Sequence, residues 1–258
     1  MNQSPPAIIL NSITRCFGQN IAVDNLSLEV RRGEVFSFLG MNGAGKTTTL
    51  RMMAGVLRPS SGQIIIGGLD LAEYPEQVKR TIGYIPDRPY LYGRLTAREF
   101  LVFVAALYGL TGEQAELCIE EFLGKYELLK VQHQLIDSFS HGMKQRLATC
   151  AALLHRPSVL IVDEPMVGLD PHGAKLLKES FRSYAQSGIA IFLSTHSLNV
   201  AEEISDRIAI IHRAKLLCVG SVSELKERYG GTSIEEVFLR LTGKEYVEEE
   251  DDIHPVAS

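Results

Sequence analysis

The sequence has no apolar run long enough to cross a membrane, because a spanning helix needs about 18 or more consecutive apolar residues. The longest candidate is FLVFVAALYGL at 100–110. At that length, with apolar side chains all round, it favours a helix buried in the protein core. The chain is therefore not expected to cross a bilayer by itself.

Cysteine is also scarce. The four cysteines, Cys16, Cys118, Cys150 and Cys218, lie far apart and form no C-x-x-C pair. The N-terminus carries no secretory pattern, so we expect reduced thiols in a cytosolic protein.

Positive charge is not in excess either. The net charge is −5, and the run of five carboxylates at 248–252 accounts for it, so the rest of the chain is nearly neutral. This argues against a broad basic surface that binds nucleic acid by counterion release, and we expect no nucleic-acid partner. We expect a folded domain at 1–245, followed by a solvated, disordered tail at 246–258.

A chain of 258 residues is long enough for one large α/β domain or for a domain with an inserted lobe. Short β-branched and apolar runs alternate with helical patterns. The expected strands are 7–13, 22–30, 35–39, 63–66, 82–85, 159–162, 189–194, 208–212 and 216–219. The expected helices follow Gly45, Leu95, Gly112, Gly142, Pro171, Ser197, Ser221 and Ser233. Strand patterns disappear between Asp87 and Gln145, which predicts a helical lobe, at about 88–145, inserted into the α/β core.

The stretch GMNGAGKTTTL at 40–50 places three glycines before a lysine and three threonines. Glycine loses more backbone freedom on folding than any other residue, so its use here indicates that a bare backbone is needed. The spacing is that of a phosphate-binding loop, and it lies between the strand pattern VFSFL and a helical pattern. The weaker alternative is a glycine-rich turn that only precedes a helix.

In a phosphate-binding loop, backbone N–H groups and the helix N-terminus surround the phosphate oxygens. Lys46 is then expected to reach the β- and γ-phosphates, and the Thr47 hydroxyl to bind Mg²⁺. The expected binding residues of the loop are Gly40, Asn42, Gly43, Ala44, Gly45, Lys46, Thr47 and Thr48.

A carboxylate pair ends the apolar strand pattern in VLIVDEP. Beside a phosphate loop, Asp163 is expected to hold the water shell of Mg²⁺, and Glu164 to polarise an attacking water molecule. Strand ends often carry acidic residues, so the pair alone would be a weak signal.

A histidine follows the strand pattern IAIFLS. A lone histidine is more often structural than catalytic. The strand before His196 is expected to lie beside the strand of Asp163, however, and the ends of neighbouring parallel strands are where such sites are built. Lys46, Glu164 and His196 are therefore the expected catalytic residues.

Together these motifs resemble the nucleotide-binding subunit of ATP-binding-cassette (ABC) transporters, over about residues 7–222. The stretch FSHGMKQR at 139–146 resembles that family's signature, usually written LSGGQ. Ser140 and Gly142 match the signature, and His141 stands for its first glycine. The resemblance implies a P-loop NTPase core with a parallel sheet, an N-terminal antiparallel β subdomain and an inserted helical lobe. Without the other motifs, Ser140 would be interpreted as an ordinary helix cap.

The resemblance also implies ATP and Mg²⁺ as ligands and a head-to-tail dimer with two ATP molecules between its subunits. Ser140 and the Gly142 backbone then bind the ATP held by the opposite subunit, and Asp170 lies at the dimer interface. Phe17 corresponds to the aromatic residue that stacks on adenine, although an aromatic near a strand end usually belongs to the core.

One position departs from the family pattern. Asp87 stands where the family usually has a glutamine that contacts Mg²⁺ or the attacking water and relays the nucleotide state to the membrane subunits. Aspartate can still bind the ion, so Thr47, Asp87 and Asp163 are the expected metal residues, but an ionised carboxylate cannot donate a hydrogen bond. Family structures also place a groove at the helical lobe for a helix of the membrane partner, and part of 100–110 could line it.

The implied function is that of an ATP-hydrolysing motor subunit of a transporter. We expect it in the cytoplasm at the inner face of the cell membrane, with a second identical or paralogous motor subunit and separate transmembrane subunits. The ending GTSIEEVFLRLTG resembles exporter-type subunits and favours export. The alternatives are an importer subunit, a soluble family member acting in translation or DNA repair, and a subunit that binds ATP without efficient turnover.

Overall fold

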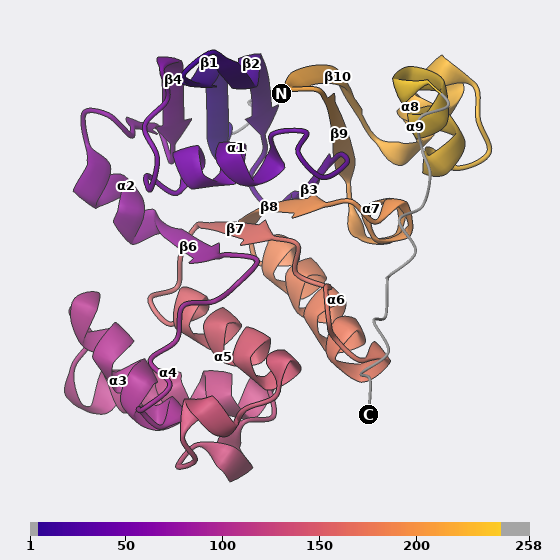
Figure 1. Cartoon of the computed structure of the whole chain (residues 1–258). Coiled ribbons are helices and arrows are strands. Elements are labelled where there is room, and N and C mark those ends of the chain that lie inside the picture. Colours follow the sequence, from indigo (N-terminus) through magenta and orange to yellow (C-terminus); the bar gives the residue numbers. More distant parts are fainter. Residues whose placement is uncertain (1–4, 244–258) are drawn as a thin grey trace, which may run out of the picture.

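The computed structural model describes residues 5–243, and the acidic run at 248–252 lies outside them. Two β-sheets lie one above the other, with helix α1 (Lys46–Met53) between them and further helices below the lower sheet (Figure 1). This is the layered α/β arrangement that the sequence predicts.

The upper sheet is antiparallel, with the strand order β2-β1-β4-β5. Its strands are β1 (Ile8–Phe17), β2 (Asn20–Val30), β4 (Ser61–Ile66) and β5 (Leu69–Asp70). Strand β1 is longer than expected and reaches Phe17. Strand β5 is missing from the expected strands because two residues are too few to show a period.

The lower, central sheet has the order β10-β9-β3-β8-β7-β6. Its strands are β3 (Val35–Leu39), β6 (Ile82–Ile85), β7 (Val159–Asp163), β8 (Ala190–Thr195), β9 (Arg207–His212) and β10 (Lys215–Gly220). All neighbours in this sheet pair in parallel except β10, which is antiparallel to β9. The residues that follow β3, β7 and β8 therefore meet at one edge of the sheet.

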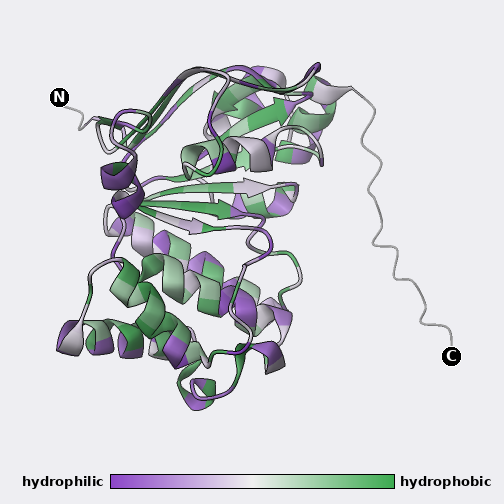
Figure 2. Ribbon diagram, turned by 60° about the vertical axis from the view of Figure 1, so that its left-hand side comes forward, coloured by the Kyte–Doolittle hydropathy of each residue, from purple (hydrophilic) through white to green (hydrophobic). Residues whose placement is uncertain are grey.

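A hydrophobic core fills the space between the two sheets and α1. Phe36 and Phe192, from the neighbouring strands β3 and β8, are fully buried there, with ring centroids 5.5 Å apart. The strands of the central sheet carry mainly hydrophobic residues (Figure 2). Because both faces of this sheet are covered, its strands show continuous apolar runs instead of an alternating pattern.

The other helices lie below and beside the central sheet. They are α2 (Pro75–Thr81), α3 (Ala97–Leu107), α4 (Gly112–Lys125), α5 (His141–Leu153), α6 (Pro171–Gln186), α7 (Leu198–Ile204), α8 (Val222–Tyr229) and α9 (Ile234–Thr242), with 3₁₀ turns at Leu129–Val131 and Ile136–Ser138. Helix α2 is missing from the expected helices. It buries Val78 but shows no repeating apolar face, so only its Pro75 at the first turn marks it.

Helices α3, α4 and α5 pack together as a helical lobe, and their buried side chains form one hydrophobic core with α6 and the lower face of the central sheet. The expectation that most residues of 100–110 pack in the core is wrong. Leu101 and Ala105 are buried, but Phe103 and Leu107 are 41 % and 68 % exposed. Helix α3 packs against α4 and α5 through one face, which leaves a second apolar face at the surface.

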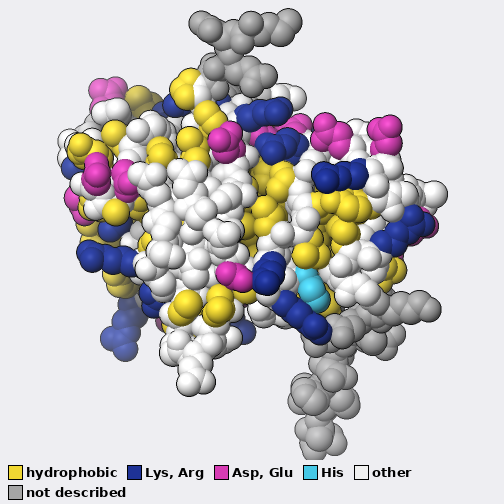
Figure 3. Space-filling view, turned by 90° about the horizontal axis from the view of Figure 1, so that it is seen from above, with side chains coloured by type: hydrophobic (Ala, Val, Ile, Leu, Met, Phe, Trp, Pro, Cys, Tyr) yellow, Lys and Arg dark blue, Asp and Glu magenta, His cyan; other side chains and the backbone are white. Residues whose placement is uncertain are grey.

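Within residues 5–243, no helix combines the length and hydrophobicity that crossing a membrane requires. On the face seen from above the antiparallel sheet, Lys and Arg side chains are interspersed with Asp and Glu side chains and with hydrophobic ones (Figure 3).

Candidate functional site

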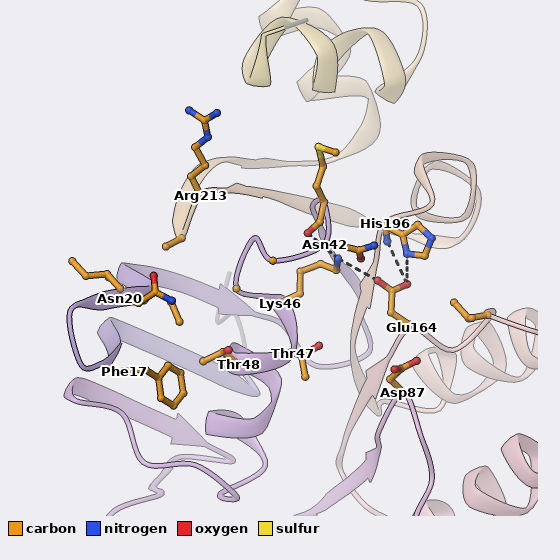
Figure 4. Close-up of a pocket in the computed structure, with 17 residues that line it drawn as sticks. Phe17, Asn20, Asn42, Lys46, Thr47, Thr48, Asp87, Glu164, His196 and Arg213 are labelled. Carbon is orange, nitrogen blue, oxygen red and sulfur yellow. Dashed lines mark hydrogen bonds and ion pairs between the residues drawn. The ribbon is translucent and has the colours of Figure 1, made fainter. Parts of the chain in front are cut away.

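A cavity of about 710 Å³ opens at the carboxyl ends of β3, β7 and β8. The glycine loop forms its floor, the turn between β1 and β2 forms one end, and the residues after β6, β7 and β8 form the other (Figure 4). The turn between β9 and β10 borders it as well, through Arg213 and Ala214. The glycine loop, the residue after β7 and His196 thus come together around one cavity.

The backbone of the glycine loop adopts conformations that would be strained for residues with a side chain. Gly43 has φ +78°, and Gly45, the N-cap of α1, has φ +111°. A side chain at Gly45 would also place its Cβ atom 2.4 Å from the backbone oxygen of Ala22. The bare main chain is therefore required, and it leaves the first N–H groups of α1 facing the cavity without a side chain in the way.

Lys46 is a buried cation, with 6 % of the residue exposed. Its Nζ atom donates hydrogen bonds to the carbonyl oxygens of Gly40 at 2.6 Å and Met41 at 3.3 Å. It also lies 3.2 Å from Glu164 Oε1 as an ion pair. A buried charge needs such partners, and together they hold the ammonium group at the cavity wall.

Asp163 ends β7 and is almost completely buried. Its Oδ1 atom accepts a hydrogen bond of 2.5 Å from the Ser194 hydroxyl, while Oδ2 is buried without a well-formed hydrogen bond among the described residues. Burial raises the pKa of this carboxyl above its ordinary value, and hydrogen bonds from Ser194 and Thr47 offset only part of that rise. The charges of Glu164 and Asp87 raise the pKa further.

Glu164 has a left-handed backbone with φ +46°, which is strained for a residue with a side chain. Its Oε2 atom lies 3.0 Å from His196 Nδ1 and accepts a hydrogen bond of 3.3 Å from the His196 backbone N–H. Burial alone would raise the pKa of Glu164, but the hydrogen bond with His196 and the charge of Lys46 outweigh burial and lower it. The carboxylate is thus held ionised between two basic groups.

The residues expected to hold Mg²⁺ fit that ion. Thr47 and Asp87 line the cavity, Thr47 is close enough to the Asp163 carboxyl to lower its pKa, and Asp163 Oδ2 is buried without a well-formed hydrogen bond among the described residues. Over residues 5–243 no group of three or more His, Cys, Asp or Glu side chains could enclose a metal ion. Mg²⁺ needs no such group, because it usually takes one or two carboxylates together with phosphate oxygens and water.

Phe17 lies at the end of the cavity formed by the β1–β2 turn. It is 48 % exposed, as is Ile21, so both offer apolar surface to a ligand instead of joining the core. Asn20 lines the same end. Ile21, Asn20 and Arg213 are absent from the sequence-predicted site because no motif marks them; only their place in the fold brings them here.

The structure does not bring every expected residue to this cavity. Gly40 and Ala44 belong to the loop but do not line the cavity, and Gly40 contributes its carbonyl to Lys46 instead. Asp163, Ser140, Gly142 and Asp170 do not line it either, and Asp163 is buried directly before Glu164, which does.

Ser140 and Asp170 cap two helices that lie outside the cavity. Ser140 caps α5 by accepting a hydrogen bond from Met143 N, and Asp170 caps α6 by accepting one from Gly173 N. Within one copy of the chain, therefore, the signature residues are not part of the cavity that the nucleotide loop lines.

Ser194 is a site residue that the motif reasoning missed. Its hydroxyl donates to Asp163 Oδ1 and accepts a hydrogen bond of 3.1 Å from the Glu164 backbone N–H. The register of the sheet explains this position, because Asp163 pairs with Ser194 across β7 and β8. Ser194 is only two residues before His196 in the sequence, but a serine in a buried strand has no pattern that marks it as a site residue.

Comparisons with a family model, with related sequences and with solved structures all identify the same family. Residues 23–167, more than half of the 258-residue chain, match the family model described as ABC transporter. Over 220 residues the chain is 42 % identical to the bacitracin transport ATP-binding protein BcrA of Bacillus licheniformis, covering 84 % of this chain and 70 % of that protein.

Two further proteins agree. The linearmycin resistance ATP-binding protein LnrL of Bacillus subtilis (strain 168) is 35 % identical over 223 residues, covering 86 % of this chain and 72 % of that protein. A solved structure described as the ATP binding subunit of an ABC transporter superimposes with a TM-score of 0.86 at 32 % identity, over 91 % of this chain and 99 % of that one.

Proposed function

The chain belongs to the ABC transporter family, and from this premise we propose that it is the motor subunit of an exporter, with Glu164 activating the water that cleaves ATP. Its fold is that of an ABC ATPase nucleotide-binding domain, so the predicted P-loop core is confirmed. The chain is an ATP-binding ATPase subunit of a transporter, and such subunits dimerise and work at the membrane with transmembrane partners.

The observation that carries the proposed chemistry is the position of Glu164 between Lys46 and His196. The lowered pKa keeps the Glu164 carboxylate ionised, so it can accept hydrogen bonds from a water molecule and later a proton. The water oxygen then bonds to the γ-phosphorus while the bond to the β-phosphate oxygen breaks, which gives ADP and phosphate.

Lys46 and the loop supply the positive surroundings for that step. In the described structure the Lys46 ammonium group is shared by two carbonyl oxygens and Glu164. When a triphosphate enters, the γ-phosphate competes with Glu164 for this cation, which frees the carboxylate for water. Thr47, Asp163 and Asp87 would hold Mg²⁺, which would neutralise negative charge on the phosphate oxygens.

We propose that the site is completed by a second copy of the chain or by a paralogue. Ser140 and Gly142 lie outside the cavity of their own chain, at the N-terminus of α5, which is a helix end suited to an anion. In a head-to-tail dimer the same residues of the partner reach the γ-phosphate, and Asp170 lies near the interface. Phe17 stacks on the adenine ring.

The transmembrane partner has a candidate docking surface on the helical lobe. Tyr90, Tyr92, Phe103 and Leu107, here called the lobe patch, are 90 %, 57 %, 41 % and 68 % exposed. The rings of Tyr92 and Phe103 contact each other edge to face at 5.6 Å. Asp87, at the cavity, lies a few residues before this patch in the chain, which suits a path from nucleotide to partner.

The names of two relatives favour export. One is named for bacitracin transport and the other for linearmycin resistance, and a transport ATPase confers resistance when it moves a toxic compound outward. We extend that direction of transport to this chain.

The test of the proposed chemistry is the substitution Glu164→Gln. Glutamine keeps the size of the side chain but cannot accept a proton, so we expect ATP binding to persist and steady-state hydrolysis to fall by about 100-fold or more. Size-exclusion chromatography with ATP should then show a trapped dimer. Glu227→Gln, at an exposed position on α8, is the matched control and should hydrolyse ATP normally. Full hydrolysis by the Glu164 variant would refute the assigned role.

A further inference from the structure

We infer that Arg15 is a positioning residue that holds the Phe17 ring for stacking on the purine base of the nucleotide. The inference rests on the proposed role of Phe17 and goes beyond it, because no motif marks Arg15 and Arg15 does not line the cavity. It acts on the nucleotide only through the ring that it contacts.

The contact is between a cation and an aromatic face. Arg15 and Phe17 are two residues apart on β1, and their side chains contact each other. The Arg15 guanidinium carbon lies 4.5 Å from the centroid of the Phe17 ring. With one face of the ring covered by Arg15, the other face is the one left for a base to stack on.

Phe17 needs this support because little else restrains it. The residue is 48 % exposed and stands at the end of its strand, next to Gly18, whose φ of +59° begins the turn to β2. A ring that rotates freely must lose that freedom when a base binds. A guanidinium group behind the ring fixes it before the base arrives, and the cation also draws on the π electrons that would repel an electron-rich purine.

Arg15 is itself anchored to the segment that follows the phosphate helix. Its Nη1 atom donates a hydrogen bond of 2.9 Å to the carbonyl oxygen of Arg58. Next to this bond, Ser60 N donates to the Thr14 carbonyl at 2.7 Å, and Cys16 N donates to the Ser60 hydroxyl at 3.1 Å. Residues 58–60 come shortly after α1, whose first turn carries Lys46, so Arg15 connects the base platform to the phosphate-binding element.

Two further observations concern how the Arg15 side chain is oriented. The pairing of β1 with β2 shifts register on both sides of Arg15, and such bulges re-aim side chains. Among residues 5–243 no carboxylate forms an ion pair with Arg15, and its Nε atom is buried without a hydrogen bond. Within that part of the chain the Arg15 guanidinium group therefore makes two contacts, with the Phe17 ring and with the Arg58 carbonyl oxygen.

The experiment is a double-mutant cycle on nucleotide binding. Arg15→Ala, Phe17→Ala and the double variant are titrated with ATP and, separately, with inorganic tripolyphosphate, which has no base. We expect Arg15→Ala to raise the Kd for ATP by about 3- to 10-fold, to raise KM similarly and to leave kcat within about 2-fold. Its Kd for tripolyphosphate should stay unchanged, and Arg15→Ala should add nothing once Phe17 is alanine.

Two further variants sharpen the result. Arg15→Lys keeps a cation near the ring and should recover part of the ATP affinity. Arg58→Ala removes a neighbouring exposed arginine side chain but keeps the backbone carbonyl that Arg15 uses, so it is the matched control and should bind ATP normally.

The outcomes separate this inference from the function on which it rests. If Phe17→Ala weakens ATP binding and Arg15→Ala does not, Arg15 has no positioning role while Phe17 keeps its own. If Phe17→Ala leaves ATP binding unchanged, the proposed base platform fails and the inference fails with it. If Arg15→Ala weakens tripolyphosphate as much as ATP, Arg15 acts on the phosphate loop or on folding, and the inference is overturned.

Discussion

At the scale of single residues, the two neighbouring carboxylates of the site have pKa values that move in opposite directions. Burial raises the pKa of Asp163, whereas His196 and Lys46 lower that of Glu164 in spite of its burial. The difference follows from the partners: Asp163 has hydroxyl groups beside it, and Glu164 has basic groups. Among the described residues Asp163 has no positively charged partner beside it, and a metal cation would provide one. This fits the roles proposed here, with Asp163 as a metal residue and Glu164 as the residue that activates water.

The Ser194 hydroxyl limits the rise in the pKa of Asp163, so its removal has a testable effect. In Ser194→Ala the pKa of Asp163 should rise further, because a hydrogen bond to the charged form is lost. Asp163 then becomes protonated at higher pH, and the acid limb of the ATPase pH profile should move upward. The loss of a partner for a buried acceptor should also lower the free energy of unfolding by about 1–3 kcal/mol.

The matched control for this variant is Ser37→Ala. Ser37 is equally buried, on the neighbouring strand β3, but its hydroxyl bonds to Ser205 and not to Asp163. Its pH profile should match that of the unchanged protein. An acid limb that stays in place in Ser194→Ala would show that Ser194 does not tune Asp163.

At the scale of elements, His155 connects the helical lobe to the central sheet. Its Nε2 atom lies 3.0 Å from the Ile82 carbonyl oxygen at the start of β6, and its ring stacks on Tyr108, the C-cap of α3, with centroids 3.7 Å apart. Because the carbonyl can only accept, Nε2 donates the hydrogen bond, and the neutral ring fits the site. Burial lowers the pKa of His155 below its ordinary value, partly opposed by the bond to Ile82.

The lowered pKa of His155 makes stability depend on pH in a defined direction. The folded protein prefers the neutral ring, so the stabilisation is complete above the unfolded pKa of about 6.5 and is lost as pH falls below it. Urea unfolding at pH 7 and at pH 5 measures how much stability is lost between the two. That loss should be smaller in His155→Gln than in the unchanged protein, and the glutamine amide can still donate a hydrogen bond to the Ile82 carbonyl. The difference should be a fraction of the roughly 1.4 kcal/mol per pH unit that one proton carries. An equal loss in both proteins would contradict the assignment.

At the scale of the whole molecule, the nucleotide cavity and the lobe patch lie on different parts of the structure. The cavity is built on the central sheet, and the patch is built on α3 and the segment before it. Substitution of the patch should therefore affect partner binding and leave the nucleotide chemistry alone.

The corresponding prediction concerns Phe103→Ser combined with Leu107→Ser. Both side chains are exposed, so the chain should fold and its purified form should hydrolyse ATP at the usual rate. In the cells that naturally contain it, the fraction of the protein that sediments with membranes should fall several-fold, since the apolar docking surface is gone. Val56→Ser, at a residue that is 67 % exposed but lies after α1, is the control and should leave sedimentation unchanged. Equal membrane fractions in all three proteins would remove the lobe patch from partner binding.

The sequence alone determined the features that a short segment must satisfy by itself. The positive φ angles of Gly43 and Gly45, the lysine at the start of a helix and the acidic end of an apolar strand are all local requirements, so they appear as contiguous motifs. The strands of the central sheet were predictable for the same reason, because burial on both faces leaves a continuous apolar run.

The tertiary structure decided which distant residues meet. Ser194 reaches Asp163 through the register of β7 and β8, and Lys46, Glu164 and His196 converge from three strand ends. It also decided that one face of α3 stays exposed, which the composition of 100–110 could not reveal because burial depends on the neighbours of a helix. Contacts between segments far apart in sequence are set by packing and strand pairing, and no local pattern of residues encodes them.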